Sequence, residues 1–493
     1  MPERSANTTS PQVPSPAPAS GLAGFCERHY LLLALCVLTL AAFNLGFRLN
    51  REVVTAWDES LYVTSAAEMV KSGDWLVTTF HGDVDYYNTK PPLNVWMIAA
   101  AFKALGINLW SMRLPSFFAA FATIATVQWW SRRCFNAITA LASTVVLSTT
   151  FGFLYVHSAR SGNPDAWLTL DIVLTVITLW SARSSPWRLV WLGPLAAVAF
   201  MLKGTAVLLP ALIVCCVLAI RRVDRRGAVA LLAAAGLFLI PTGAWAVARW
   251  RFDRWRFFDG LFNYDFVERI TQPLEGHNSN PLYYLNILQK DHYDWLVTAV
   301  VLLIVLVLSR RDRQPVRLPL DRDMRLLLGV WAGATLLVPT LMATRLPWYL
   351  NPFYPLFAIT VGAIVAAGFE AFSQPGHRRE RVVVATMVLL AFGVAETKLL
   401  WYSYKRDLDG TMQAFFIESP EMVEGRRVLL EEWDPADHFV LTHIANGVAV
   451  TGNPEQFAAG ANEHDLLILM PAHDGGWVLT SASTRPESLQ TRP

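Results

Sequence analysis

The chain has 493 residues, of which 54% are hydrophobic and only 16% are charged, and its mean hydropathy is +0.34. Soluble domains are about 25% charged, so this composition excludes a soluble enzyme, a coiled coil and a disordered chain, and it indicates a membrane protein. The net charge of +2 gives no reason to expect nucleic-acid binding. None of the five cysteines has metal-ligand spacing, and we expect neither a disulfide framework nor a cofactor.

The first 29 residues precede the first long apolar segment. Positions 1–22 consist largely of Pro, Ser, Ala and other small or polar residues. Such a segment buries too little apolar surface to offset the entropy of ordering. We therefore expect residues 1–29 to form a disordered cytoplasmic tail.

Eleven segments have the length and apolarity of a membrane-spanning helix. They are 30–47, 114–130, 136–156, 164–181, two within 189–220, 227–248, 293–309, 326–343, 348–368 and 382–402. The stretch 189–220 counts twice because Leu202-Lys203-Gly204 interrupts it, which favours two helices joined by a tight turn. The sequence thus predicts an all-α polytopic membrane domain over 30–402.

The distribution of basic residues orients these spans. If the short segment 93–107 does not span, the Lys- and Arg-rich connections all fall on one side, and by the positive-inside rule that side is cytoplasmic. We therefore interpret 93–107 as an amphipathic helix lying on the membrane. Two large loops, 48–113 and 249–292, then face the periplasm. Residues 403–493 follow on the same side, and their strand-length apolar runs around a helical stretch predict a small soluble α/β domain.

Ionisable residues are costly at membrane depth, so their positions indicate function. On the outer side they occur in the two large loops and in the short turns between spans. They are Asp58, Glu59, Lys90, Arg160, Asp165, Lys203, Glu268, Arg269, His277 and Arg345. A mixed cluster suits an anionic, lipid-linked substrate, because carboxylates can act as bases and Lys or Arg can bind phosphate. Whether a metal ion binds near Glu268 and His277 stays open.

Each of these features also has a plain structural interpretation. Asp58 and Glu59 would favour the dipole of a helix that begins there. Lys203 could extend its ammonium from the membrane to the interface. The alternating Arg and aromatic residues of 249–257 could form an interfacial belt, or they could gather an anionic lipid headgroup.

Several short motifs, taken in their order along the chain, resemble those of a known family. The motifs are Asp58-Glu59, Ser72-Gly73-Asp74-Trp75, Asn88-Thr89-Lys90-Pro91-Pro92-Leu93, Arg113-Leu114-Pro115-Ser116, Ala159-Arg160-Ser161-Gly162-Asn163-Pro164-Asp165-Ala166, Leu202-Lys203-Gly204, Asn263-Tyr264-Asp265-Phe266-Val267-Glu268 and Arg345-Leu346-Pro347-Trp348-Tyr349. From about 30 to 370 the chain resembles the bacterial aminoarabinose transferases and protein O-mannosyltransferases. These are GT-C-type glycosyltransferases that use polyprenyl-phosphate sugars.

The resemblance implies roles for individual residues. Asp58 would be the essential acid of the first outer loop, and Lys203 and Arg345 would bind the phosphate of the donor. Lys90 and Asp165 would line the substrate cavity. The other residues that we predict for the cavity are Glu59, Tyr62, Arg160, Glu268, Arg269, His277 and Tyr349. The family usually has Lys-Gly-Pro where this chain has Lys203-Gly204-Thr205, and the acceptor stays open.

The leading interpretation is an inverting glycosyltransferase of the bacterial inner membrane whose active site faces the periplasm. It would move a sugar from polyprenyl (undecaprenyl) phosphate to lipid A, another envelope glycan or a protein. The alternative is a transporter or flippase of lipid-linked sugars, which would need ionisable groups near the middle of the membrane. Asp171 and Glu396 are the two candidates for such groups.

Overall fold

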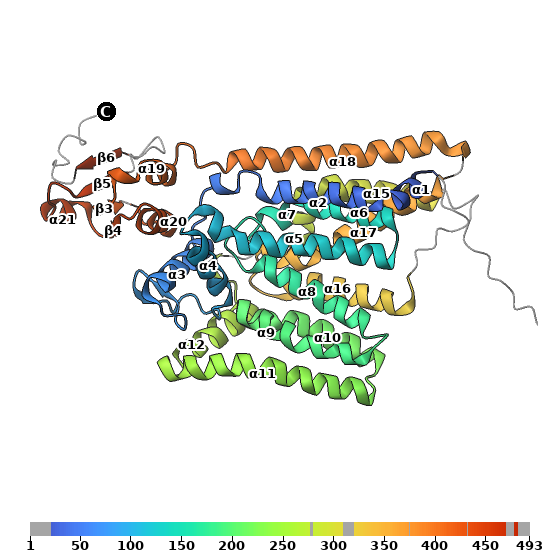
Figure 1. The fold of residues 1–493 in the computed structure, drawn as a ribbon, viewed down its shortest axis with the longest axis horizontal. Helices are drawn as coiled ribbons and strands as arrows, with labels where there is room; N and C mark the ends of the chain where they lie inside the picture. Colours follow the sequence, from blue (N-terminus) through green and yellow to red (C-terminus); the bar gives the residue numbers. More distant parts are fainter. Residues whose placement is uncertain are drawn as a thin grey trace, which may run out of the picture.

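Long helices dominate the computed structural model, which describes residues 21–276, 280–308, 320–373, 375–430, 432–469 and 478–481. The helices of the bundle are α1 (Gly21–Arg28), α2 (Tyr30–Gly46), α5 (Leu109–Cys134), α6 (Ala137–Ser148), α7 (Phe151–Tyr155), α8 (Asp165–Ser181), α9 (Leu192–Lys203), α10 (Leu208–Arg221), α11 (Arg225–Asp253), α15 (Tyr293–Leu308), α16 (Arg322–Leu341), α17 (Tyr354–Ala371) and α18 (Arg378–Lys405). They run along the long axis of the molecule (Figure 1).

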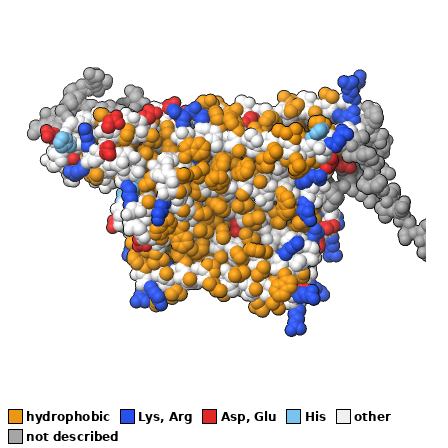
Figure 2. Space-filling view, viewed as in Figure 1, with side chains coloured by type: hydrophobic (Ala, Val, Ile, Leu, Met, Phe, Trp, Pro, Cys, Tyr) orange, Lys and Arg blue, Asp and Glu red, His pale blue; other side chains and the backbone are white. Residues whose placement is uncertain are grey.

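Small residues let the helices of the core approach closely. At Gly362 of α17, an added Cβ would collide with the Ser143 backbone and side chain and with the Thr139 carbonyl of α6. Such contacts are typical of helices that associate in lipid, where packing rather than water exclusion holds them together. Hydrophobic side chains cover the middle of the bundle, and most charged side chains lie toward its two ends (Figure 2).

Six helical segments are long and apolar enough to cross a membrane, or seven if the bent pair Tyr283–Asp291 and Tyr293–Leu308 is one span. This count covers only the described residues. The six are Tyr30–Arg51, Pro186–Arg221, Arg225–Asp253, Arg322–Leu341, Pro347–Ala371 and Arg378–Lys405. The structure is therefore that of a multi-pass helical membrane protein, while the number of eleven spans stays a prediction.

The chain reverses direction between α9 and α10. Just before α9, Leu189 lies against Gly227 at the start of α11. Farther along α9, the Phe200 ring packs against Trp245, 6.1 Å between centroids, toward the end of α11. Because α10 ends only four residues before α11 begins, it must return along the bundle. Gly204 makes the turn with a φ of 52°, which a side chain would disfavour.

The first outer loop folds into a helical layer at one end of the bundle. It contains α3 (Asp58–Ser72), the strands β1 (Thr79–Phe80) and β2 (Asp83–Val84), and α4 (Leu93–Leu105). Helix α4 covers the predicted segment 93–107, and its position relative to a membrane stays a prediction. The second large loop contains α12 (Arg256–Asp259), α13 (Arg269–Thr271) and α14 (Tyr283–Asp291), with a π-helix over Gly260–Glu268.

Strands and short helices alternate after α18. The strands β3 (Arg427–Leu430), β4 (Val448–Val450), β5 (Leu466–Leu469) and β6 (Val478–Ser481) form one sheet in the order β4-β3-β5-β6. The β3 strand pairs in parallel with β4 and β5, and β6 is antiparallel to β5. The helices are α19 (Met412–Glu418), α20 (Pro435–Phe439) and α21 (Pro454–Ala459). This C-terminal part lies at the same end of the bundle as α3 and α4 (Figure 1).

Candidate functional site

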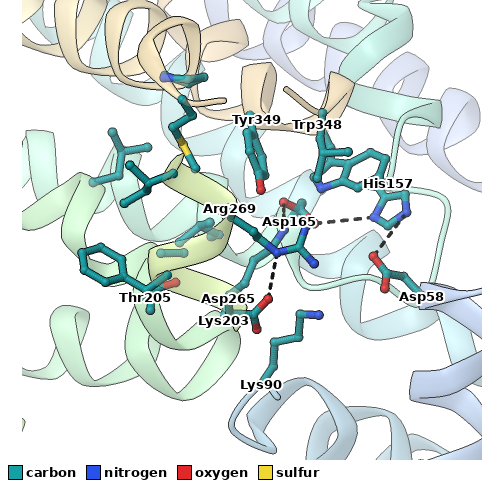
Figure 3. A pocket seen from close by; sticks show the side chains of 18 of the residues that line it. Asp58, Lys90, His157, Asp165, Lys203, Thr205, Asp265, Arg269, Trp348 and Tyr349 are labelled. Carbon is teal, nitrogen blue, oxygen red and sulfur yellow. Dashed lines mark hydrogen bonds and ion pairs between the residues drawn. The ribbon is translucent and has the colours of Figure 1, made fainter. Parts of the chain in front are cut away.

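A cavity of about 660 Å³ opens between the outer loops and the ends of the bundle helices. Its polar side is lined by Asp58, Lys90, His157, Asp165, Lys203, Asp265, Arg269 and Tyr349, among others. These residues come from loops and helix ends far apart in the sequence, and their side chains face one space (Figure 3). Of the residues predicted for the site, the structure brings six to this cavity, namely Asp58, Lys90, Asp165, Lys203, Arg269 and Tyr349.

Asp58 is the first residue of α3, where the helix dipole favours a negative charge. Burial alone would raise the pKa of its carboxyl. The positive charges of Lys90, His157, Lys203 and Arg269 outweigh this effect and hold the pKa below its usual value. Asp58 is therefore an ionised acceptor for a proton at neutral pH.

His157 bridges two aspartates in the cavity. Its Nε2 lies 3.8 Å from Asp58 Oδ2, and its Nδ1 lies 3.9 Å from Asp165 Oδ2. The imidazole ring stacks on Trp348 with 3.8 Å between ring centroids. The backbone of His157 has a φ of 55°, a conformation that non-glycine residues rarely adopt and that is enriched at functional sites. Figure 3 shows His157 between the two carboxylates.

Lys203 and Asp165 form the adjoining ion pair. Lys203 ends α9, Asp165 begins α8, and Lys203 Nζ donates to Asp165 Oδ1 at 2.7 Å. The two residues meet because α9 packs against α8 and ends where α8 begins. This pair continues the row that begins with Asp58 and His157.

Two further cations enter the cavity from the outer loops. Arg269 donates through Nε to Asp265 Oδ1 at 2.9 Å, one helical turn away. For Lys90, no carboxylate oxygen of the described residues lies within 4.0 Å of the ammonium. Burial lowers the pKa of Lys90, but the negative charge of Asp265 together with Tyr62 and Asp58 raises it above its usual value. Lys90 thus offers the cavity a positive charge that no ion pair neutralises.

The other side of the cavity is apolar. Its lining includes Leu168 of α8, Ala206 of the α9–α10 turn, Leu208 and Leu209 at the start of α10, Phe266 and Ile270 from the second outer loop, and Val338, Pro339 and Met342 at the end of α16. A ligand that fills the whole cavity must therefore carry an anionic or hydroxyl-rich end and a hydrocarbon part.

Several residues predicted for the site lie elsewhere in the structure. Glu59 forms a fully buried ion pair with Arg113, with Nε to Oε1 at 3.0 Å. Arg160 pairs with Glu52 in the same way, and both side chains are buried. These two pairs join the first outer loop to the bundle and do not line the cavity.

Tyr62, Glu268 and Arg345 are also absent from the cavity lining. Tyr62 is buried in the apolar core of the outer layer, and Arg345 donates through Nε to the carbonyl of Thr340 at 3.1 Å. A role for Arg345 in phosphate binding therefore stays a prediction. His277 lies outside the described residues.

The cavity also contains residues that the sequence analysis did not select as site residues, namely His157, Asp265, Tyr264, Glu275, Trp57 and Trp348. For Asp265 a signal was present, because it lies four residues before Arg269 within a recognised motif. Nothing in the sequence marked His157. Over the described part of the chain, no three His, Cys, Asp or Glu side chains group as a metal site requires.

Residues 89–245 match the protein family described as dolichyl-phosphate-mannose-protein mannosyltransferase. An uncharacterized protein of Aquifex aeolicus is 25% identical over 67% of this chain and 63% of its own length. The undecaprenyl phosphate-alpha-4-amino-4-deoxy-L-arabinose arabinosyl transferase 2 of Pseudomonas fluorescens is 28% identical over 74% of this chain and 61% of its own length. The chain thus spans just over three fifths of these two relatives.

Two solved structures share the fold. ArnT from Cupriavidus metallidurans, bound to undecaprenyl phosphate, superimposes with a TM-score of 0.66 at 16% identity, covering 94% of this chain and 98% of ArnT. The Archaeoglobus fulgidus oligosaccharyltransferase in the apo form gives a TM-score of 0.54 at 11% identity, covering 88% of this chain and 65% of that protein. These matches confirm the resemblance to the GT-C glycosyltransferases and show that the chain has their membrane fold.

Proposed function

We propose that the chain is an inverting glycosyltransferase that transfers a sugar from polyprenyl (undecaprenyl) phosphate to an acceptor in the periplasm. One observation carries the proposal: a single cavity joins an ionised carboxylate, several cations and an apolar wall. A polyprenyl-phosphate sugar has the matching parts, which are a hydrocarbon chain, a phosphate and a sugar. Relatives named as arabinosyl transferases, and the undecaprenyl phosphate bound to ArnT, support the same donor.

The reaction would be a single displacement at the anomeric carbon. An acceptor oxygen forms the new bond to that carbon while the bond to the phosphate oxygen breaks, and polyprenyl phosphate leaves with the electron pair. Asp58 takes the proton of an acceptor hydroxyl as general base. If the acceptor is itself a phosphate, as on lipid A, no base is needed and Asp58 positions it.

The cations of the cavity would stabilise the charge that grows on the leaving phosphate. Lys90 is the leading candidate because no carboxylate of the described residues forms an ion pair with it, and Lys203 and Arg269 add to the positive field although each is paired with an aspartate. The aminoarabinose relatives suggest lipid A as an acceptor, while another envelope glycan or a protein would fit the same chemistry. The location would be the inner membrane, with the cavity facing the periplasm.

The alternative, a transporter or flippase, has weaker support. Asp171 is buried and makes no hydrogen bond to the described residues. Glu396 accepts a hydrogen bond from Asn44 at 2.9 Å. Neither of them lines the cavity, so they do not extend it into a path across the bundle.

The test is transfer of radiolabelled sugar from an undecaprenyl-phosphate donor by the purified full chain in detergent, where transport cannot be scored. Mass spectrometry of lipid A, glycans and periplasmic proteins from a deletion strain identifies the acceptor to use. We expect Asp58→Asn to lower transfer by at least about a hundredfold, with normal membrane insertion. The matched control is Asp83→Asn, an exposed aspartate of the same loop. Equal activity of Asp58→Asn and wild type would refute the assigned role of Asp58.

A further inference from the structure

Two exposed tryptophans meet where the C-terminal part contacts the first outer loop. Trp57 precedes Asp58, lines the cavity and is 58% exposed. Trp433 belongs to the segment between β3 and α20 and is 46% exposed. Their rings lie edge to face with 5.9 Å between centroids. The aromatic surface formed by Trp57 and Trp433 thus begins at the candidate base and extends onto the C-terminal part.

The conformation of Trp57 is unfavourable by itself. Its φ of 65° and ψ of −116° lie outside the regions that a bulky residue ordinarily occupies. Strain of this kind persists only where the surroundings impose it, and it occurs preferentially at ligand sites. Here it accompanies the exposure of two large indole rings. A ligand that covers the rings would explain their exposure, and a ligand site at this position would explain why the strained backbone is kept.

The contact between the two parts fixes Trp433 relative to Trp57. The backbone of Val54 exchanges two hydrogen bonds with the side chain of Gln413, at 2.7 and 3.1 Å. Lys71 Nζ lies 3.0 Å from His443 Nδ1. Apolar residues of the outer loop and of the C-terminal part also share one buried cluster. The aromatic surface is therefore built by both parts and is held in place before a ligand arrives.

We infer that Trp57 and Trp433 form a saccharide-binding subsite that holds a sugar ring of the acceptor beside Asp58. The inference rests on the proposed function and specifies the acceptor as a glycan or glycolipid. A pyranose has a face of C–H groups that stacks on an indole and a rim of hydroxyls that needs polar neighbours. Asp58 follows Trp57 directly, and Glu432 and Asp434 flank Trp433. The sugar oxygen that reaches Asp58 is then the nucleophile.

Other occupants fit this surface less well. A hydrocarbon chain would gain nothing from the carboxylates around the rings, and the cavity already offers an apolar wall at its other side. A peptide acceptor would need donors and acceptors for its backbone, which two indole faces do not supply. The site thus assigns a function to the C-terminal part: it completes the acceptor side of the cavity.

The test measures binding rather than turnover, so that it does not depend on knowing the donor sugar. The full chain is placed in lipid nanodiscs, because sugar detergents would compete for the subsite. The probe is the phosphate-free glucosamine disaccharide that forms the backbone of lipid A, followed by saturation-transfer NMR and by titration. We expect Trp433→Ala to weaken its affinity about fivefold or more and Trp433→Phe to retain most of it.

Trp401→Ala is the matched control, since Trp401 is an exposed tryptophan of α18 that does not line the cavity. Undecaprenyl phosphate binding is measured in parallel and should be the same in all variants. Failure of the wild type to bind the disaccharide, or equal binding by wild type and Trp433→Ala, would overturn the subsite. Preferential binding of a Ser/Thr-rich peptide that Trp433→Ala abolishes would do the same. Failure of the wild type to bind undecaprenyl phosphate would instead count against the proposed donor.

Discussion

Lys203 Nζ donates to Asp165 Oδ1 at 2.7 Å, and both side chains are largely buried. The charge of Lys203 is therefore balanced before any substrate enters the cavity. Lys90, across the same cavity, has no carboxylate partner among the described residues. Two lysines that look equivalent in the sequence thus differ in the charge that they offer to a phosphate.

This difference predicts different behaviour on substitution. Lys90→Gln should lower turnover by about a hundredfold, the usual effect of losing one group that stabilises developing charge. Lys203→Met should also lower turnover, but chiefly because it leaves Asp165 buried and unpaired. The double variant Asp165→Asn/Lys203→Met should therefore be more active than Lys203→Met alone. Turnover is measured in the transfer assay, with the exposed Lys103→Gln as control.

The double variant decides the role of Lys203. If Lys203 only balances the charge of Asp165, removing both charges restores part of the lost turnover. If Lys203 itself contacts the donor phosphate, the double variant stays as impaired as Lys203→Met or becomes worse, and the pairing argument is wrong.

His157 should set the pH dependence of the reaction on its acid side. The charge of His157 is one of those that hold the pKa of Asp58 below its usual value. His157→Gln removes that charge, so the pKa of Asp58 should rise and its carboxylate should be lost at a higher pH. The acid limb of the profile of kcat/KM against pH should then move to higher pH. The control is Lys103→Gln, whose acid limb should match that of the wild type. If the acid limb of His157→Gln also stays at the same pH, the titration of Asp58 does not determine it.

Composition and local pattern predict a part of the site from the sequence alone. The break at Lys203-Gly204 is visible because a charge and a glycine interrupt an apolar run. Counting spans and basic loops predicts one common side for Asp58, Lys90 and Asp165, and the structure places all three in one cavity, while the periplasmic position of that cavity stays a prediction. Both features depend on residues that are neighbours in the chain.

Long-range pairing could not be read in the same way. Arg113 bonds Glu59 across 54 residues, and Arg160 bonds Glu52 across 108. In the sequence, Glu59 and Glu52 look no different from Asp58. Only the packing of the helices buries the two glutamates in ion pairs and leaves Asp58 in the cavity. His157 has the same difficulty, because its role arises from a left-handed backbone conformation in a loop.

For Glu59 we therefore predict a role in the stability of the fold and not in catalysis. Burial raises the pKa of its carboxyl, but Arg113 lowers it to about 2. Because the folded pKa lies below the unfolded value, the pair contributes stability above about pH 4.5 that is lost as the pH falls toward 2. Glu59→Gln should cost about 3 kcal/mol at neutral pH by leaving Arg113 buried and unpaired, while turnover per folded molecule changes far less than in Asp58→Asn.

Thermal unfolding in detergent at about pH 7 and about pH 3.5 checks this prediction. The difference in Tm between wild type and Glu59→Gln should be smaller at the lower pH, because the wild-type pair then contributes less. A difference that is equal at both values would show that the carboxylate charge of Glu59 is not what stabilises the fold.

The last prediction concerns the direction of the chain through the membrane. Helices α3, α4 and α12 and the C-terminal strands lie at one end of the bundle (Figure 1), and Asp58 and Lys90 of the first outer loop line the cavity. The Arg-rich turn between α10 and α11 follows the end of α10 away from Lys203. By the positive-inside rule that turn is cytoplasmic. A reporter fused after residue 405 should therefore be periplasmic, and one fused at 224 cytoplasmic. Five predicted spans separate residue 224 from residue 405, so reporters on the same side at these two positions would contradict the span count. A periplasmic reporter at 224 together with a cytoplasmic one at 405 would contradict the surface placement of α4, because a spanning α4 would exchange the two sides.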